Sequence, residues 1–242
     1  MSSDQGTIIA KRSVSLSKTY PLIGIFMALL GVVISSSSRV IGNLPTTGIP
    51  VNAAGTSGLD LTTALPLVSV ALQVFAAIIF ATPVLLLYVY DKNNGVLEYF
   101  LSLGMNQGDI YRRYLKAALI LASGIVGFEV VIDVAAGLIQ GTSGLMLLEG
   151  SGLVVAIAIP AVSFSTLIMM SFSSLQKQRV GSNQPLGMAI GIFTVLPAYL
   201  IPFVLPSLAL EIDLLLAVVI AVLSVLMYLS SSRLISREKL LP

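Results

Sequence analysis

Residues 92–116, KNNGVLEYFLSLGMNQGDIYRRYLK, form the most polar long stretch in a chain of 242 residues. With Asp91 just before it, this stretch holds seven of the chain's charged side chains, which comprise 13 basic and 11 acidic residues. A long apolar segment lies on each side of it. Because about 20 apolar residues suffice for a helix to span a bilayer, the pattern predicts two spans joined by a polar elbow over residues 91–116.

The composition of the whole chain favours a membrane protein. Hydrophobic residues make up 56% of the chain and charged residues only 10%, whereas a soluble domain has about 25% charged residues. We therefore predict an all-α integral membrane protein. The absence of histidine and cysteine excludes disulfides, thiolate or imidazole metal sites, and Ser-His or Cys-His nucleophiles, so we predict no metal site and no catalytic residue.

Six segments are long and apolar enough to be spanning helices. They cover residues 21–41, 64–90, 117–140, 152–175, 186–205 and 212–231. We predict one six-helix transmembrane domain over 21–232, an amphipathic lead-in over 1–20 and a basic tail over 233–242. The first span is also open to interpretation as a signal peptide, because basic residues precede its apolar core. We favour a retained helix, since that leader is long for a signal peptide.

The basic residues are unevenly divided between the two sides of this six-span scheme. One side holds all of them except Arg39: Lys11, Arg12, Lys18, Lys92, Arg112, Arg113, Lys116, Lys177, Arg179, Arg233, Arg237 and Lys239. Loops rich in lysine and arginine stay in the cytoplasm. We therefore predict a multi-pass protein of the cell membrane with both termini and the elbow on the cytoplasmic side.

The elbow has helical signals of its own. Apolar residues recur at helical spacing over 95–103, which predicts a short amphipathic helix. Gly104 suits the left-handed residue that ends many helices, and Asn106 with Asp109 three residues later suits the start of the next helix. Physics alone favours a helix that lies in the lipid headgroups.

The elbow resembles the region between the second and third spans of the ABC transporter type-2 permease family. That family has a Gly-[Thr/Val]-Leu-Glu core, a Leu-Leu-Ser-like step and a lysine at the head of span three. The matching residues here are Gly95, Val96, Leu97, Glu98, Leu101, Ser102 and Lys116. The ending SRLISREKLL, residues 232–241, is similar to the basic tail of these permeases.

The resemblance implies a permease subunit of an ATP-driven exporter that works by alternating access. The elbow would be the coupling helix, and the residues implied to contact a separate ATP-binding cassette ATPase are Gly95, Val96, Leu97, Glu98, Phe100, Leu101 and Ser102. ATP and Mg²⁺ would bind to that partner, since no Gly-Lys-Ser/Thr follows a glycine-rich loop in this chain. Further implied partners are a second copy or a similar permease and membrane lipids, but no nucleic acid.

Glu129 and Asp133 form a second candidate site in the third span. They are four residues apart and thus share one face, roughly 20–25 Å along the helix from Lys116. Carboxylates within a span are costly and suggest a cation or proton site, although they could also lie near the outer interface or accept hydrogen bonds from another span. We expect both to face other helices, with Gly124 and Gly127 admitting a neighbour. With no basic residue expected at that depth, their partners would be hydroxyls, backbone groups, water or a cation.

Two other classes of function compete with the permease. An ion-coupled secondary carrier could use Glu129 and Asp133, although it would need discontinuous helices and inverted repeats. An intramembrane aspartyl protease is suggested by VYD at 89–91 and GD at 108–109. The second protease motif requires glycine where this chain has Asn106, and both aspartates border a charged loop. The sequence identifies no substrate.

Overall fold

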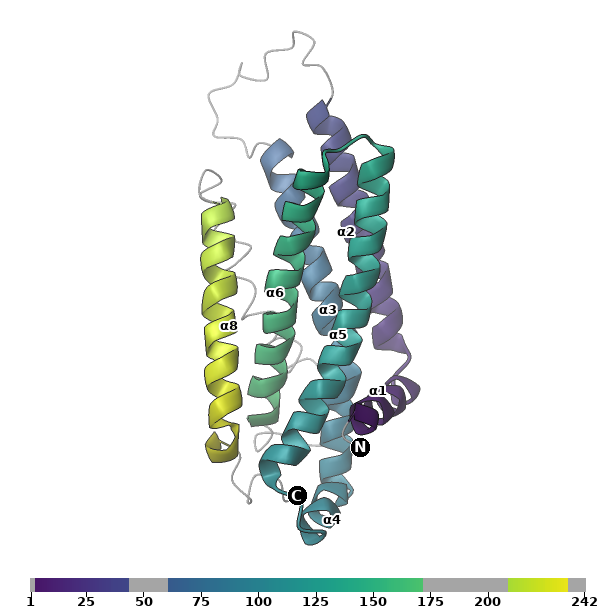
Figure 1. Cartoon of the computed structure of the whole chain (residues 1–242). Helices are drawn as coiled ribbons and strands as arrows, with labels where there is room; N and C mark the ends of the chain where they lie inside the picture. Colours follow the sequence, from purple (N-terminus) through teal and green to yellow (C-terminus); the bar gives the residue numbers. More distant parts are fainter. Residues whose placement is uncertain (1–2, 44–60, 172–208, 235–242) are drawn as a thin grey trace.

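The computed structural model describes residues 3–43, 61–171 and 209–234 (Figure 1). Within these ranges the chain forms seven α-helices and no strand. The helices are α1 (Ser3–Leu16), α2 (Thr19–Asn43), α3 (Leu61–Asn93), α4 (Val96–Ser102), α5 (Gln107–Ile139), α6 (Gly144–Ser171) and α8 (Ala209–Leu234). Four of them, α2, α3, α5 and α6, are long and apolar enough to cross a membrane, and α8 has a shorter apolar stretch over Ala217–Leu229.

These helices agree with the predicted class, a helical membrane protein. The four long helices coincide with the predicted spans 21–41, 64–90, 117–140 and 152–175, and α8 coincides with the predicted span 212–231. The predicted span 186–205 lies outside the described residues, as does most of the predicted tail. The number of six spans therefore stays a prediction.

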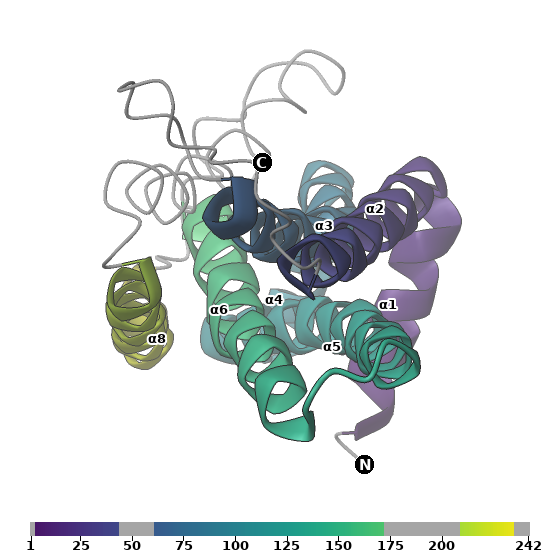
Figure 2. The ribbon, with the colours of Figure 1, turned by 90° about the horizontal axis from the view of Figure 1, so that it is seen from above.

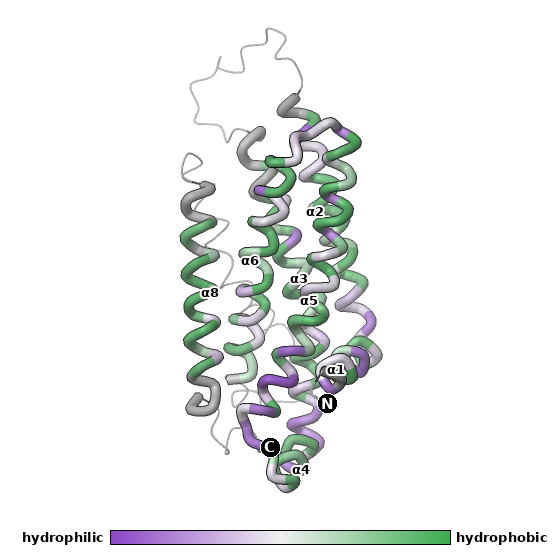
Figure 3. The backbone as a smooth tube through the Cα atoms, in the orientation of Figure 1, coloured by the Kyte–Doolittle hydropathy of each residue, from purple (hydrophilic) through white to green (hydrophobic). Residues whose placement is uncertain are grey.

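The long helices stand side by side, and two short helices lie at one end of them. Helix α1 runs across the bundle instead of along it, and α4 lies beyond the ends of α3 and α5 (Figures 1 and 2). We call this the elbow end, and the end where α5 meets α6 the opposite end. Hydrophilic residues gather at the elbow end, whereas the long helices are hydrophobic over most of their length (Figure 3).

Helix α3 is the central helix of the described bundle. It packs against α2, α5 and α6 along its length, and 72% of its apolar span is buried. Small residues allow this close packing, because backbones approach most closely where side chains are short. They are Ala71, Ala76, Ala77 and Ala81. By contrast, α2 and α8 leave apolar side chains exposed along much of their length, as expected for helices that face lipid.

Candidate functional site

The backbone of the elbow is fixed at both ends of α4 by residues that the sequence identified. Gly95 precedes α4 with φ 70° and Gly104 follows it with φ 78°, a left-handed conformation that glycine adopts without strain. The side chain of Asn106 then accepts a hydrogen bond from the backbone N–H of Gly108 at 3.3 Å. Helix α5 begins directly after Asn106. The predicted helix-stop-helix arrangement is confirmed.

The two faces of α4 have different surroundings. Leu97 is 0% exposed and belongs to the core of the bundle, and Phe100 and Leu101 pack partly against that core. Tyr99 and Leu103 are each 61% exposed. The remaining exposed side chains of this face are those of Glu98 and Ser102.

The expected contact of Leu97 with a partner stays a prediction. In this structure its side chain is enclosed within its own chain, where it anchors α4 to the bundle. We define the elbow face as the exposed residues Glu98, Tyr99, Ser102 and Leu103. The sequence pattern located the apolar residues of α4 but could not show whether they turn toward the bundle or away from it.

Next to α4, the ends of three helices meet around a buried aspartate. Asp91 at the end of α3 is 2% exposed and accepts a hydrogen bond from the Tyr114 hydroxyl of α5 at 2.6 Å. Arg12 of α1 forms an ion pair with it, with 3.0 Å between Nη2 and Oδ1. The Tyr88 ring packs edge-on against Tyr114, with 5.3 Å between ring centroids. This cluster ties α1 to the base of the elbow.

Sequence reasoning missed the Asp91 cluster, because Arg12 and Asp91 are 79 residues apart and no local pattern connects them. The cluster also bears on the two aspartates considered for a protease. Asp91 is occupied by Arg12 and Tyr114, whereas the side chain of Asp109 is 57% exposed, with 3.8 Å between its Oδ1 and Nη1 of Arg112. The two aspartates therefore do not face each other inside the bundle, as a pair of protease aspartates would.

Toward the opposite end, Glu129 and Asp133 both lie inside the bundle, as predicted. Glu129 is 0% exposed and Asp133 is 6% exposed. The expectation that no basic partner reaches them is wrong, because Arg39 of α2 forms an ion pair with Asp133. Arg39 also donates to the backbone carbonyl of Asp133 at 3.2 Å and to the Ser35 hydroxyl at 2.9 Å. The depth of Arg39 relative to α5 depends on how α2 packs against α5, and the sequence alone does not predict this packing.

The small residue that admits Arg39 is Gly137, not the two glycines expected. A Cβ atom at Gly124 or Gly127 would have no heavy atom within 4 Å, so these positions face open space. At Gly137 a Cβ would collide with the Leu147 side chain and lie 2.9 Å from Nη1 of Arg39. Gly137 therefore makes room both for the Leu147 side chain of α6 and for the guanidinium of Arg39.

Glu129, one helical turn from the ion pair, is the more unusual carboxyl group. Both of its side-chain oxygens are buried and accept no hydrogen bond from any residue that the structure describes. A buried carboxylate is costly unless hydrogen bonds or an opposite charge compensate it. Glu129 therefore offers unused acceptor capacity deep inside the bundle.

Hydrogen bonds between polar groups join α2 and α3 at about the same depth in the bundle as Glu129. The Ser69 hydroxyl donates to the Gly31 carbonyl at 2.9 Å, and Gln73 donates to Ser69 at 3.3 Å. Counted at about 1.5 Å per residue from the helix ends, Gln73 and Glu129 lie about 15–18 Å from the opposite end of the bundle. Polar side chains of α3 and α5, with a backbone carbonyl of α2, thus lie at a similar depth in this half.

Four helices that can cross a membrane, with polar residues gathered at one end, indicate a helical membrane protein. No protein-family model, no curated protein and no solved structure matches the chain. Within the described residues, the elbow and the buried charges are the features that bear on function.

Proposed function

We propose that this chain is the membrane-spanning permease subunit of an ATP-driven exporter of the ABC type-2 kind. In this proposal the elbow end faces the cytoplasm, and a separate ATPase chain binds the elbow face and holds ATP and Mg²⁺. A second copy or a similar permease completes the transport path.

The observation that carries the proposal is the attachment of α4. This helix connects two spans, begins with the family-like residues Val96–Glu98 directly after Gly95, and is held to its own bundle by the fully buried Leu97. Its other side, the elbow face, exposes the large side chains of Tyr99 and Leu103. It also exposes the carboxyl group of Glu98 and the hydroxyl of Ser102. An attachment of this kind suits the transfer of force, because a helix fixed to a packed core moves with that core.

The Asp91 cluster supports the same mechanism. Through Arg12 and Tyr114 it joins α1, α3 and α5 where α4 begins. When the partner ATPase closes on ATP, the displacement of α4 would reach two spanning helices together. Alternating access needs such a joint movement of spans and not the bending of a loop.

Recovery of the native complex tests this proposal. The tagged chain, purified in mild detergent from its own membrane, should bring down an ATPase chain in equal amount. The double variant Tyr99→Ser/Leu103→Ser should lose that ATPase while remaining folded, because both side chains are exposed. Leu138→Ser changes an equally exposed residue at the opposite end and should retain it. Recovery of no ATPase by the unaltered chain would refute the proposal.

A second candidate function, an ion-coupled secondary carrier, is favoured by the buried carboxyl group of Glu129, whose oxygens accept no hydrogen bond from the residues that the structure describes. Such a carrier would take up substrate into proteoliposomes when an ion gradient is imposed without ATP. Glu129→Gln should abolish that uptake. Uptake that needs ATP and the partner chain would instead favour the permease.

A further inference from the structure

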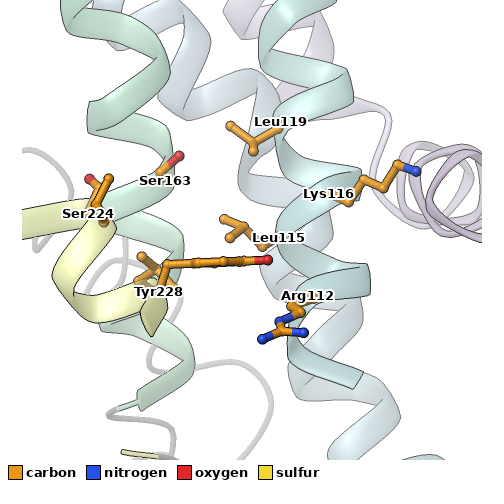
Figure 4. Close-up of a pocket in the computed structure, with 9 residues that line it drawn as sticks. Arg112, Leu115, Lys116, Leu119, Ser163, Ser224 and Tyr228 are labelled. Atoms are coloured by element: carbon orange, nitrogen blue, oxygen red, sulfur yellow. The ribbon is translucent and has the colours of Figure 1, made fainter. Parts of the chain in front are cut away.

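A cavity of about 480 Å³ lies between α5, α6 and α8 in the elbow half of the bundle (Figure 4). Its volume falls within the range of about 300–1,000 Å³ that is usual for small-molecule sites. Neither the elbow face nor Glu129 and Asp133 contribute to its lining. The cavity is therefore separate from both sites described above.

The walls of the cavity are mainly apolar. They include Leu115 and Leu119 of α5, Leu167 of α6 and Val225 of α8. The Ser224 hydroxyl also lines it but is engaged with backbone, 2.7 Å from the Ile220 carbonyl and 3.0 Å from that of Pro160. Walls of this composition suit an alkyl chain.

One end of the cavity is polar because of Arg112 and Tyr228. The Arg112 guanidinium lies 5.3 Å from the centre of the Tyr228 ring, so the two side chains connect α5 with α8 (Figure 4). Asp109 lies beside the guanidinium, with 3.8 Å between its Oδ1 and Nη1 of Arg112, and both side chains are more than half exposed. Exposed pairs of this kind contribute little, which leaves guanidinium donors available to an anion.

Lys116 does not add a second charge to this end. Its amino group points away from the cavity, toward α1, so that only its aliphatic part contributes to the lining (Figure 4). Among the described residues that line the cavity, Arg112 thus supplies the one charge at this end, and its guanidinium can bind one phosphate group through two parallel hydrogen bonds.

The depth of these residues matches the layers of a bilayer leaflet. Arg112 lies about 8 Å from the start of α5 and Tyr228 about 9 Å from the end of α8, near the level where tyrosine and arginine meet headgroups. Leu119 lies about 18 Å from the start of α5, within the hydrocarbon layer. An amphiphile with its anionic group at Arg112 would therefore place its alkyl chain between the three helices.

We propose that this cavity binds an anionic phospholipid from the leaflet at the elbow end. The phosphate contacts Arg112, the Tyr228 hydroxyl offers a further donor, and one acyl chain lies between α5, α6 and α8. The lipid thereby fills the space between α5 and α8 beside the helix that carries the elbow. The proposal does not depend on the function proposed above, since any protein of this fold in a bilayer would meet such a lipid.

Retention of lipids by the purified full chain tests this site. Native mass spectrometry would measure binding of phosphatidylglycerol and of phosphatidylcholine with the same acyl chains. The unaltered chain should prefer phosphatidylglycerol, and Arg112→Gln should weaken its binding about tenfold through loss of a charge-assisted contact. Arg113→Gln is the matched control, with the same change of charge at the next residue, which does not line the cavity.

A second pair of variants tests the acyl-chain part. Val225→Phe fills the cavity from an exposed position on α8 and should weaken binding of phosphatidylglycerol about tenfold. Val222→Phe adds the same ring to an exposed position of α8 outside the cavity and should leave binding unchanged. Unchanged thermal unfolding of each variant without added lipid checks that the fold is retained.

Four results would overturn the proposal. Equal losses in Arg112→Gln and Arg113→Gln would assign the lipid preference to the general surface charge. Full binding in Val225→Phe, or displacement of the lipid by glycerol phosphate at equal concentration, would show that no acyl chain enters the cavity. Cross-links from Val225 to a second copy in lipid-free protein would assign the space to a protein contact.

Discussion

Removal of the Arg39 guanidinium should destabilise this protein far more than loss of an ordinary hydrogen bond between membrane helices. The side chain of Arg39 is 18% exposed and that of Asp133 is 8% exposed, so water screens the pair only weakly. In Arg39→Met the Asp133 carboxylate stays buried and loses this cationic partner. Breaking a buried pair from one side costs about 3–5 kcal/mol, whereas interhelical hydrogen bonds in membranes average about 0.6 kcal/mol.

We expect Arg39→Met to lower the free energy of unfolding by about 3 kcal/mol. For a chain of this size that is a decrease of about 6–12 °C in Tm, measured by thermal unfolding in detergent micelles. The double variant Arg39→Met/Asp133→Leu removes both charges and should regain most of the loss, because apolar residues can replace a buried ion pair at little cost. Arg113→Met, a change at a partly buried arginine of the elbow end, is the control and should alter stability by about 0.5 kcal/mol or less.

Two outcomes would refute this reasoning. A loss below about 1 kcal/mol in Arg39→Met would show that the pair contributes no more than an exposed surface pair. A double variant as unstable as the single variant would show that the unpaired Asp133 charge is not the source of the cost.

Three further predictions follow from the packing, each measured on purified protein. Gly137→Ala should lower stability by about 1–3 kcal/mol, because the new methyl group meets Leu147 and Arg39, whereas Gly124→Ala faces open space and should not lower it. Leu97→Ser should lower Tm by several degrees, since it places a hydroxyl in the core, and a Tm equal to that of the unaltered chain would contradict the anchoring role given to Leu97. Asp91→Asn should weaken the ion pair with α1 and speed proteolysis within α1, and an unchanged cleavage rate would show that this pair does not hold α1 in place.

The elbow was predictable from sequence because its boundaries depend on neighbouring residues. Positive φ at Gly95 and Gly104 and a side-chain cap at Asn106 act within a few residues of chain, so their sequence signals are local. The orientation of α4 was not predictable. Whether Leu97 faces the bundle or a partner depends on how α3 and α5 pack, and an amphipathic pattern is the same in both cases.

For the buried charges, too, the local pattern was predictable from the sequence and the contacts between helices were not. Their spacing on α5 correctly predicted that Glu129 and Asp133 lie on one inward face. The partner of Asp133 could not be found, because Arg39 lies 94 residues earlier and was expected on the side opposite the other basic residues, not at the depth of Asp133. Glycine alone was likewise a weak guide to close packing, since Gly137, and not Gly124 or Gly127, lies against a neighbouring helix.

Helix α5 extends from the Asp91 cluster beside the elbow to the Arg39–Asp133 pair, and this restricts how the helices can move in the proposed transport cycle. Its 33 residues extend about 50 Å, from the base of the elbow to the level of Arg39. A displacement applied at α4 would tilt α5, and its opposite end could then move away from α2 only if the Arg39–Asp133 pair separates or α2 follows. Because separation leaves two charges in a poorly hydrated place, joint movement of α2 and α5 is the less costly course. In the proposed permease, α2, α3 and α5 would therefore move as one unit, with the opening between that unit and another part of the transport path.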